Sequence, residues 1–226
     1  MSTAEAATTR RVDGSFLRAR LGSLLAVVPL AVWTVNHLWN NLSAFQGAAQ
    51  WQVDVTEYRH PIVFFASGLV ALLPLVLHTV WGIGRLLSAR PNNVRYKFFG
   101  NIKYAVQRLS AIGVMFFLGA HIWLAFLDPR INTGRPEAFG HIAHEMQHHL
   151  PTLLVYVLGT LGVAYHLANG LHSFSMGWGL VVSRRALKRL DVGVIGIFLV
   201  LLAMSWGAIY ALWSAGGAGG AGGAAS

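Results

Sequence analysis

Residues 192–202 read VGVIGIFLVLL, a run without one charged or hydrogen-bonding side chain. A helix of this sequence has no polar face to turn towards water, so it does not suit the surface of a soluble helix bundle. The composition points the same way, because 55% of the 226 residues are hydrophobic and only 11% are charged. A soluble domain of this size needs a larger charged fraction to cover its surface. We therefore predict a protein that lies in a lipid bilayer.

Four further apolar stretches occur along the chain. A helix needs about 20 residues to cross the hydrocarbon core of a bilayer, and five stretches reach that length: 17–41, 61–87, 103–127, 150–181 and 191–214. The fourth is longer than a bilayer requires, which favours a tilted helix. We predict an all-α integral membrane protein with five transmembrane helices in one domain (17–214), helices one to four forming a four-helix bundle. Residues 1–16 are expected to be an inner N-terminal segment, and residues 215–226 a disordered Gly/Ala tail.

The basic residues give this predicted bundle an orientation. Of the 17 Lys and Arg residues, all but Arg59, Arg130 and Arg135 belong to the end of the bundle that holds the N-terminus. Cytoplasmic segments of membrane proteins carry the excess of Lys and Arg, so we predict that the N-terminus is inside. No short apolar segment with a cleavage site follows the first residues, and no signal peptide is expected.

The number of cysteines limits which cofactors this chain can hold. The chain has no cysteine and ten histidines. It therefore cannot hold a thiolate-ligated iron–sulfur cluster, a covalently attached c-type haem or a cysteine-ligated zinc ion. Redox chemistry in this chain would need a cofactor with other ligands, for which the histidines are the candidates.

Four histidines fall deep inside the predicted helices: His37, His78, His121 and His166. Ligating side chains inside a bilayer are costly and are candidates for function. Helices one and three run outwards, and at 1.5 Å per residue His37 and His121 both lie about 27 Å from the inner face. Helices two and four run inwards, and His78 and His166 both lie towards the inner side. The four imidazoles thus form two pairs, each at one depth, as bis-histidine ligation of haem requires. We predict two haem b groups with these four histidines as axial ligands of the iron.

Two glycines support this prediction. Gly82 and Gly170 each follow a histidine by four residues and so share its helix face. A position without a side chain lets a porphyrin plane approach the helix backbone.

The order and spacing of several motifs resemble one known family. They are RLGSLL (20–25), NHLWNN (36–41), LHTVWG (77–82), QRLSAI (107–112), AHIW (120–123), YHLANGLHSF (165–174) and WG (178–179). Together they resemble the dihaem cytochrome b subunit of succinate:menaquinone reductases, the five-helix membrane anchor of complex II in Gram-positive and related bacteria. The resemblance covers roughly residues 17–213 and is merely apolar in the fifth helix.

The resemblance implies a role in electron transfer. His78 and His166 would ligate the proximal haem, and His37 and His121 the distal haem. Electrons from succinate would pass through a flavoprotein subunit with FAD and an iron–sulfur subunit on the inner face. They would then cross the two haems to a quinone, menaquinone, in a bacterial cytoplasmic membrane. The chain itself would be an anchor and electron conduit, not an enzyme on its own, and no nucleic-acid partner is expected.

Further residues are candidates for haem and quinone contacts. Arg20 and Arg108 lie nearest the hydrocarbon on the basic side and, with Ser23, are predicted contacts of haem propionates. The inner basic residues also suit the iron–sulfur subunit or anionic lipid. Glu57 and His60, in a cluster with Asp54 and Arg59, are predicted to exchange protons with quinone near the distal haem, although a solvated loop explains them equally well.

One motif is typical of a different kind of protein, a zinc protease. Residues 144–148 read HEMQH and match the H-E-x-x-H pattern of zinc proteases. A protease also needs a third ligand and a cleft, and Pro151 opens the next helix almost at once, so we expect a short amphipathic helix that caps the outer end. Adventitious metal binding there stays open. His172 lies six residues after His166 and faces elsewhere, which predicts a polar packing residue or a propionate contact.

Two other functions stay open at this point. The first is the same anchor role in a quinol:fumarate reductase, where electrons run in reverse. The second is a histidine-lined metal transporter without haem, which is disfavoured because the deep histidines are paired and no Asp or Glu lies at the hydrocarbon centre.

Overall fold

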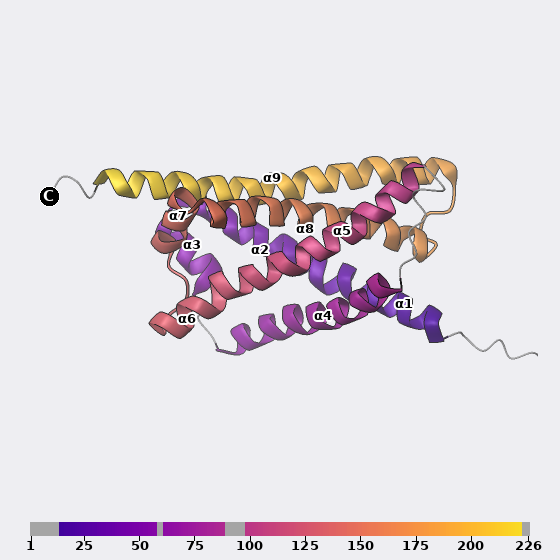
Figure 1. The fold of residues 1–226 in the computed structure, drawn as a ribbon, viewed down its shortest axis with the longest axis horizontal. Helices are drawn as coiled ribbons and strands as arrows, with labels where there is room; N and C mark the ends of the chain where they lie inside the picture. Colours follow the sequence, from indigo (N-terminus) through magenta and orange to yellow (C-terminus); the bar gives the residue numbers. More distant parts are fainter. Residues whose placement is uncertain (1–13, 58–60, 89–97, 223–226) are drawn as a thin grey trace, which may run out of the picture.

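The computed structural model describes residues 14–57, 61–88 and 98–222, and within these ranges every regular element is a helix. Five helical segments are long and apolar enough to cross a membrane: Arg20–Gln46, Phe65–Leu87, Phe99–Thr133, Leu150–Gly177 and Arg184–Gly217. They lie roughly side by side along the long axis of the molecule (Figure 1). The expected all-α, five-helix membrane protein is confirmed.

The first span is built from four consecutive helical pieces. They are α1 (Gly14–Leu25), the π-helical η1 (Ala26–Leu30), α2 (Ala31–Asn41) and the 3₁₀ turn η2 (Leu42–Gln46). Pro29 lies inside η1. Proline has no N–H to donate and its ring crowds the preceding turn, which is why the α-helical pattern widens there.

The next elements lead into the second and third spans. Short α3 (Ala48–Trp51) and π-helical η3 (Gln52–Thr56) precede α4 (Pro61–Leu87), which begins with proline, a residue suited to the first turn. The third span joins α5 (Phe99–Ile122), π-helical η4 (Trp123–Leu127) and α6 (Asp128–Thr133). It ends at Gly134, whose φ of 70° is left-handed and favours glycine.

The last three helices complete the bundle. They are α7 (Phe139–His148), α8 (Leu150–Gly177) and α9 (Arg184–Gly222). Helix α8 packs against α5 on one side and α9 on the other, whereas α4 packs mainly against α1 and η1. Helix α7 lies across α9 and α8 near their shared end, beside α3 (Figure 1).

The two ends of the bundle differ in chemistry. At one end α1 and α9 begin and α8 stops; we call it the basic end, and its described cations are Arg20, Arg85, Lys103, Arg108, Arg184, Arg185, Lys188 and Arg189. At the other end, the histidine-rich end, α7 and its C-cap carry His141, His144, His148 and His149. A buried cluster that includes Trp51, Phe139, Met146 and Tyr156 packs under α7.

Two boundaries differ from those expected from the sequence. Helix α8 stops at Gly177 instead of 181, because the chain turns at Gly179 with a left-handed φ of 70°. Helix α9 continues to Gly222, through most of the Gly/Ala segment expected to be disordered. The physical reason lies at Gly216, where a side chain would collide with the backbone of Ala143. Small residues let α9 pack directly against α7 at this position.

Candidate functional site

The structure brings His37 of α2 and His121 of α5 close together, with their rings edge to face. Their ring centroids lie 5.8 Å apart and the ring planes are at 71°. Aromatic rings flank both imidazoles: Trp33 stacks on His37 at 4.8 Å and Phe117 stacks on His121 at 5.6 Å. Stacked rings limit the rotation of each imidazole, so this pair is held in a defined orientation.

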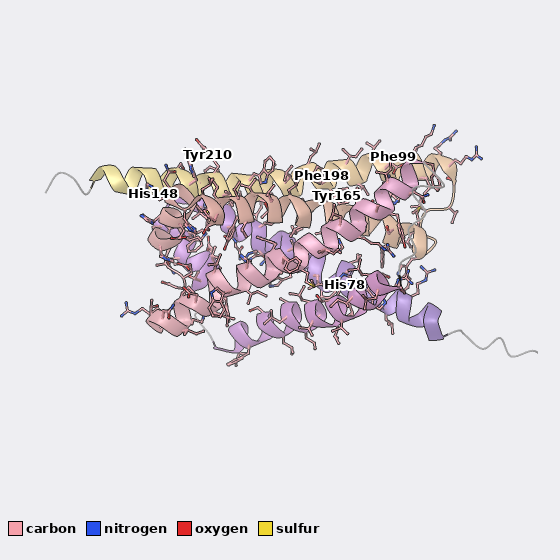
Figure 2. All side chains as sticks on the ribbon, in the orientation of Figure 1. His78, Phe99, His148, Tyr165, Phe198 and Tyr210 are labelled. Carbon is pink, nitrogen blue, oxygen red and sulfur yellow. The ribbon has the colours of Figure 1, made fainter. Side chains whose placement is uncertain are left out.

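A second pair forms between α4 and α8. The ring centroids of His78 and His166 lie 6.4 Å apart, with the planes at 66°. His78 lies in the half of the molecule nearer the basic end, whereas His148 marks the opposite end (Figure 2). The two depth-matched pairs expected from the sequence are therefore the two pairs that meet in space, and their role as iron ligands stays a prediction.

The spacing of both pairs suits one metal between two rings. A metal–imidazole bond is about 2 Å long. Adding roughly 1.2 Å from each nitrogen to its ring centroid, two rings that share a metal have centroids roughly 6.4 Å apart. The separations of 5.8 and 6.4 Å come close to this value. Among the described residues no group of three or more His, Cys, Asp or Glu side chains could hold a metal ion.

Hydrogen bonds fix the rings of the His78–His166 pair from their Nδ1 side. His78 Nδ1 lies 3.2 Å from the carbonyl oxygen of Gly22, to which it can donate. His166 Nδ1 lies 3.2 Å from both Ser110 Oγ and Gln107 Nε2. Because the Ser110 hydroxyl donates to the Gln107 carbonyl, its oxygen is able to accept from His166 Nδ1–H. With the proton on Nδ1, Nε2 of both rings is the nitrogen left for a metal, as is usual for protein ligands. Gln107 Nε2, which can only donate, favours the other tautomer of His166.

The His37–His121 pair is held less symmetrically. His121 Nδ1 lies 3.2 Å from the hydroxyl of Tyr156. Asn41 donates through Nδ2 to the carbonyl of His37 at 2.8 Å, and the same amide lies 3.4 Å from His37 Nε2. Asn41 therefore competes for the nitrogen that a metal would use.

The helix surface is not tightly packed at the two expected glycines. A Cβ built on Gly82 would meet no atom within 4 Å, and one on Gly170 would have its nearest neighbour, Gln107 Nε2, at 3.7 Å. Neither glycine is needed for helix–helix contact. Their position one turn after a histidine is consistent with a ligand plane that lies against the backbone.

The expected propionate contacts are placed at the basic end. The Arg108 guanidinium lies 3.6 Å from the Tyr104 ring centroid, and its Nε is buried with no hydrogen-bond partner among the described residues. Arg20 lies over the Trp178 ring at 5.9 Å. Ser23 Oγ accepts from Trp178 Nε1 at 3.1 Å. The structure thus joins Arg20 and Ser23 through one tryptophan and places Arg108 apart from them, next to Gln107.

Of the two expected quinone residues, the described part of the chain contains Glu57 alone. Glu57 is exposed at the end of η3, and His60 lies outside the described residues. Nearby, Asp54 accepts two hydrogen bonds from Gln50, at 2.9 Å each. Their role in quinone binding stays a prediction.

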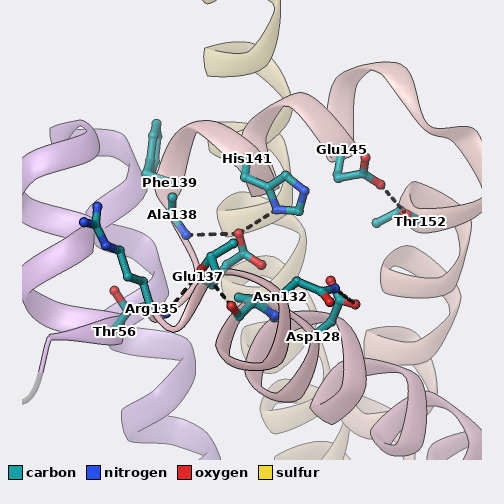
Figure 3. Close-up of polar contacts among 12 residues, drawn as sticks. Thr56, Asp128, Asn132, Arg135, Glu137, Ala138, Phe139, His141, Glu145 and Thr152 are labelled. Carbon is teal, nitrogen blue, oxygen red and sulfur yellow. Dashed lines mark hydrogen bonds and ion pairs between the residues drawn. The ribbon is translucent and has the colours of Figure 1, made fainter.

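One buried carboxylate was not predicted from the sequence. Glu137, whose side chain is 3% exposed, accepts through Oε1 from the Ala138 amide at 3.0 Å and pairs with His141 Nδ1 at 2.7 Å (Figure 3). Its Oε2 is buried with no partner among the described residues. Gln52 makes two hydrogen bonds to the same segment. Its Nε2 donates to the Glu137 carbonyl, and its Oε1 accepts from the Phe139 amide. A lone glutamate in a connecting segment carries no pattern that could have revealed this burial.

The H-E-x-x-H segment forms the expected cap. Its two histidines, His144 and His148, are exposed on α7 with ring centroids 4.7 Å apart. Glu145 is engaged elsewhere, because Thr152 Oγ1 donates to it at 3.1 Å and His149 lies 3.3 Å away. The described residues supply no third ligand to this pair.

His172 has a partner of its own at the basic end. Its Nε2 lies 3.1 Å from Asp191 Oδ1, which also accepts from Lys103 Nζ at 2.7 Å. The buried imidazole is therefore part of an ion-pair network that links α5, α8 and α9. This agrees with the polar packing role expected for His172.

Comparison with known proteins adds one clear similarity. No family model matches the chain. The chain is 28% identical over 202 residues to the succinate dehydrogenase cytochrome b558 subunit of Bacillus subtilis (strain 168), covering 87% of this chain and 96% of that protein. The similarity to a cytochrome b membrane anchor of complex II, predicted from the histidine motifs, is confirmed.

Proposed function

We propose that this chain is the membrane anchor and dihaem cytochrome b subunit of a succinate dehydrogenase. The observation that carries the proposal is that the four deep histidines lie in two close pairs, His78–His166 and His37–His121. The similarity to a protein named as a cytochrome b558 subunit supports it over nearly the whole chain.

In this proposal the four histidines hold two haem b groups. His78 and His166 would ligate the proximal haem, nearer the basic end, and His37 and His121 the distal one. Haem b, when bound, supplies a carrier that accepts and releases one electron at a time. The chain's own residues orient the imidazoles through Gly22, Ser110 and Tyr156, and the apolar helix faces exclude water from them.

Arg108 is the best candidate for a propionate contact. Its buried Nε has no partner among the described residues, and a carboxylate would complete its hydrogen bonds. Arg108 follows Gln107, which contacts His166, so it lies on the side of the proximal pair. Arg20 and Ser23 remain weaker candidates, because both already contact Trp178.

The partners follow from the same proposal. A flavoprotein subunit with FAD and an iron–sulfur subunit would dock at the basic end, which would face the cytoplasm of a bacterium, with the N-terminus inside. Electrons would leave the distal pair for a quinone, menaquinone, near the histidine-rich end. Glu57 and His60 are the proposed proton-exchanging residues there. The reverse direction, quinol to fumarate, uses the same anchor chemistry and is decided by haem potentials.

The first test is optical. In the purified chain, a reduced-minus-oxidised spectrum with haem quantification should give two protohaems per polypeptide. His78→Ala and His166→Ala should each remove the same haem, and His37→Ala and His121→Ala the other. His172→Asn is the matched control, because this buried imidazole pairs with Asp191 and should leave both haems in place.

The pattern of losses separates the alternatives. Absence of haem from a folded, membrane-inserted chain would refute the cytochrome proposal and leave histidine-dependent metal transport. Loss of haem in a different pairing would refute the assignment of ligands while keeping a haem protein.

A further inference from the structure

A cavity of about 250 Å³ lies between the first span, α8 and α9. Its seven lining residues are all apolar: Val27, Ala31, Val35, Leu167, Leu171, Ile197 and Leu201. Helices α8 and α9 run alongside each other over this length, as Figure 1 shows. The cavity therefore lies within the membrane-spanning part of the bundle.

This cavity is separate from the imidazole pairs. Val35 precedes His37 by two residues, which places the two side chains about 200° apart around the helix. Leu167 follows His166 directly and points about 100° away from it. His37 and His166 face α5 and α4, whereas the cavity is bordered by α9. The cavity is not fully enclosed, because Val35 is 46% and Ile197 is 37% exposed.

The lining determines what can occupy the cavity. It offers no polar group, so water would be unstable in it and an apolar occupant is favoured. At roughly 30 Å³ for a group the size of a water molecule or a methylene, the volume takes about eight methylene groups, a large part of one acyl chain. A quinone ring is a poor occupant, because its two carbonyl oxygens would find no hydrogen-bond donor.

The first span and α8, which line the cavity, continue to a cation at the basic end. Arg20 precedes Val27 by seven residues and Trp178 follows Leu171 by seven, so each lies about 10 Å further along its helix axis. The two meet there, with the Arg20 guanidinium 5.9 Å from the Trp178 ring centroid. A tryptophan beside an arginine is typical of the depth at which lipid phosphates lie.

The charges around this position favour an anion. Helix α9 adds exposed Arg184, Arg185, Lys188 and Arg189. The acidic Asp191 nearby is already paired with Lys103 and His172. Among the described residues, the mouth of the cavity is thus positively charged.

We propose that the first span, α8 and α9 form a binding site for an anionic phospholipid. One acyl chain occupies the cavity, and the phosphate lies beside Arg20 and Trp178. The site holds the three helices together on the side that bears no histidine pair. It does not depend on haem, so its failure and the failure of the proposed function can be told apart.

The test uses the full-length chain, purified in the assembly in which cells make it and returned to phosphatidylcholine vesicles. Spin-labelled phosphatidylglycerol and spin-labelled phosphatidylcholine report how many lipids the protein immobilises. We expect a roughly fivefold preference for phosphatidylglycerol, the factor that one basic residue near the phosphate supplies. Ala31→Phe fills the cavity and should abolish the preference, as should Leu171→Phe from the opposite wall.

The matched control is Val32→Phe. Val32 neighbours Ala31 on the same helix but is 67% exposed on the outside of the bundle. It should keep the preference, and Arg20→Gln should reduce it while the acyl chain stays immobilised. An unchanged preference in Ala31→Phe, or equal binding of the two lipids to the unaltered protein, would overturn the proposal. So would recovery of an isoprenoid quinone from the cavity in place of phospholipid.

Discussion

Three of the four deep imidazoles use Nδ1 for a hydrogen bond within the protein. The partners are the Gly22 carbonyl for His78, the Tyr156 hydroxyl for His121 and the Ser110 hydroxyl for His166. Such outer partners fix the tautomer and the ring orientation of a metal ligand and tune its basicity. If the four histidines hold two haems as proposed, the differences among these partners should give the two haems different potentials.

Tyr156→Phe tests this idea for the distal pair. Loss of the hydroxyl removes a hydrogen-bond partner of His121 Nδ1, so the imidazole donates less charge and the distal haem potential should rise. Outer partners change metal properties by about tenfold or more, which for one electron corresponds to a shift on the order of 60 mV. A redox titration followed at the haem bands measures it.

Tyr165→Phe is the control for this change. Tyr165 is on the same helix and packs on Phe198 at 6.5 Å, away from the imidazoles. Figure 2 shows Tyr165 and Phe198 between α8 and α9. Equal shifts in both variants, or a shift confined to the proximal haem, would contradict the role of Tyr156.

At the scale of helices, glycines decide how closely the spans approach. Gly22 of α1 faces the Trp81 ring, and Gly159 of α8 faces the Phe117 ring, in each case with no room for a Cβ. Membrane helices lack a hydrophobic force that drives them together and rely on such close packing. Trp81 lies three residues from His78 and Phe117 four residues from His121, so each contact positions a helix that carries a deep histidine.

Gly159→Ala should therefore destabilise the bundle. The new methyl group overlaps the Phe117 ring, and overpacking of this kind costs about 1–3 kcal/mol. The midpoint of thermal unfolding, followed by loss of the haem band or by circular dichroism, should fall by a few degrees.

Gly162→Ala provides the comparison on the same helix. Its Cβ would lie 3.6 Å from Val114 Cγ2, an ordinary contact. Alanine is also the better helix former by roughly 1 kcal/mol, so this variant should be neutral or more stable. The packing argument fails if the two variants unfold at the same temperature.

For the molecule as a whole, the difference between the two ends predicts an orientation. The described cations concentrate at the basic end, and the exposed histidines of α7 at the other. Because the natural chain has no cysteine, single cysteines can report on each end without background. Ser88→Cys, at the basic end, should react with a membrane-impermeant maleimide only from the cytoplasmic side, and Gly140→Cys, on α7, only from the outer side. Labelling of both from one side would refute the predicted topology.

Distances along the sequence alone determined the number of membrane spans and the depth of each deep histidine. Apolar length predicted five spans because the thickness of a bilayer fixes how many helical residues are needed. The depth of each histidine followed from the rise of a helix and the alternation of direction. These quantities depend on distance along the chain, and the pairs His37–His121 and His78–His166 that they predicted are the pairs that meet.

The tertiary structure alone decided what lies around those histidines. Contacts such as Tyr156 with His121, or Ser110 with His166, join residues that are 35 and 56 positions apart. The packing of helices across the bundle likewise decides the burial of Glu137, the length of α9 and the apolar cavity beside it. Helix periodicity states which face a residue occupies, but which neighbour fills the space opposite is decided by the packing of all the helices together.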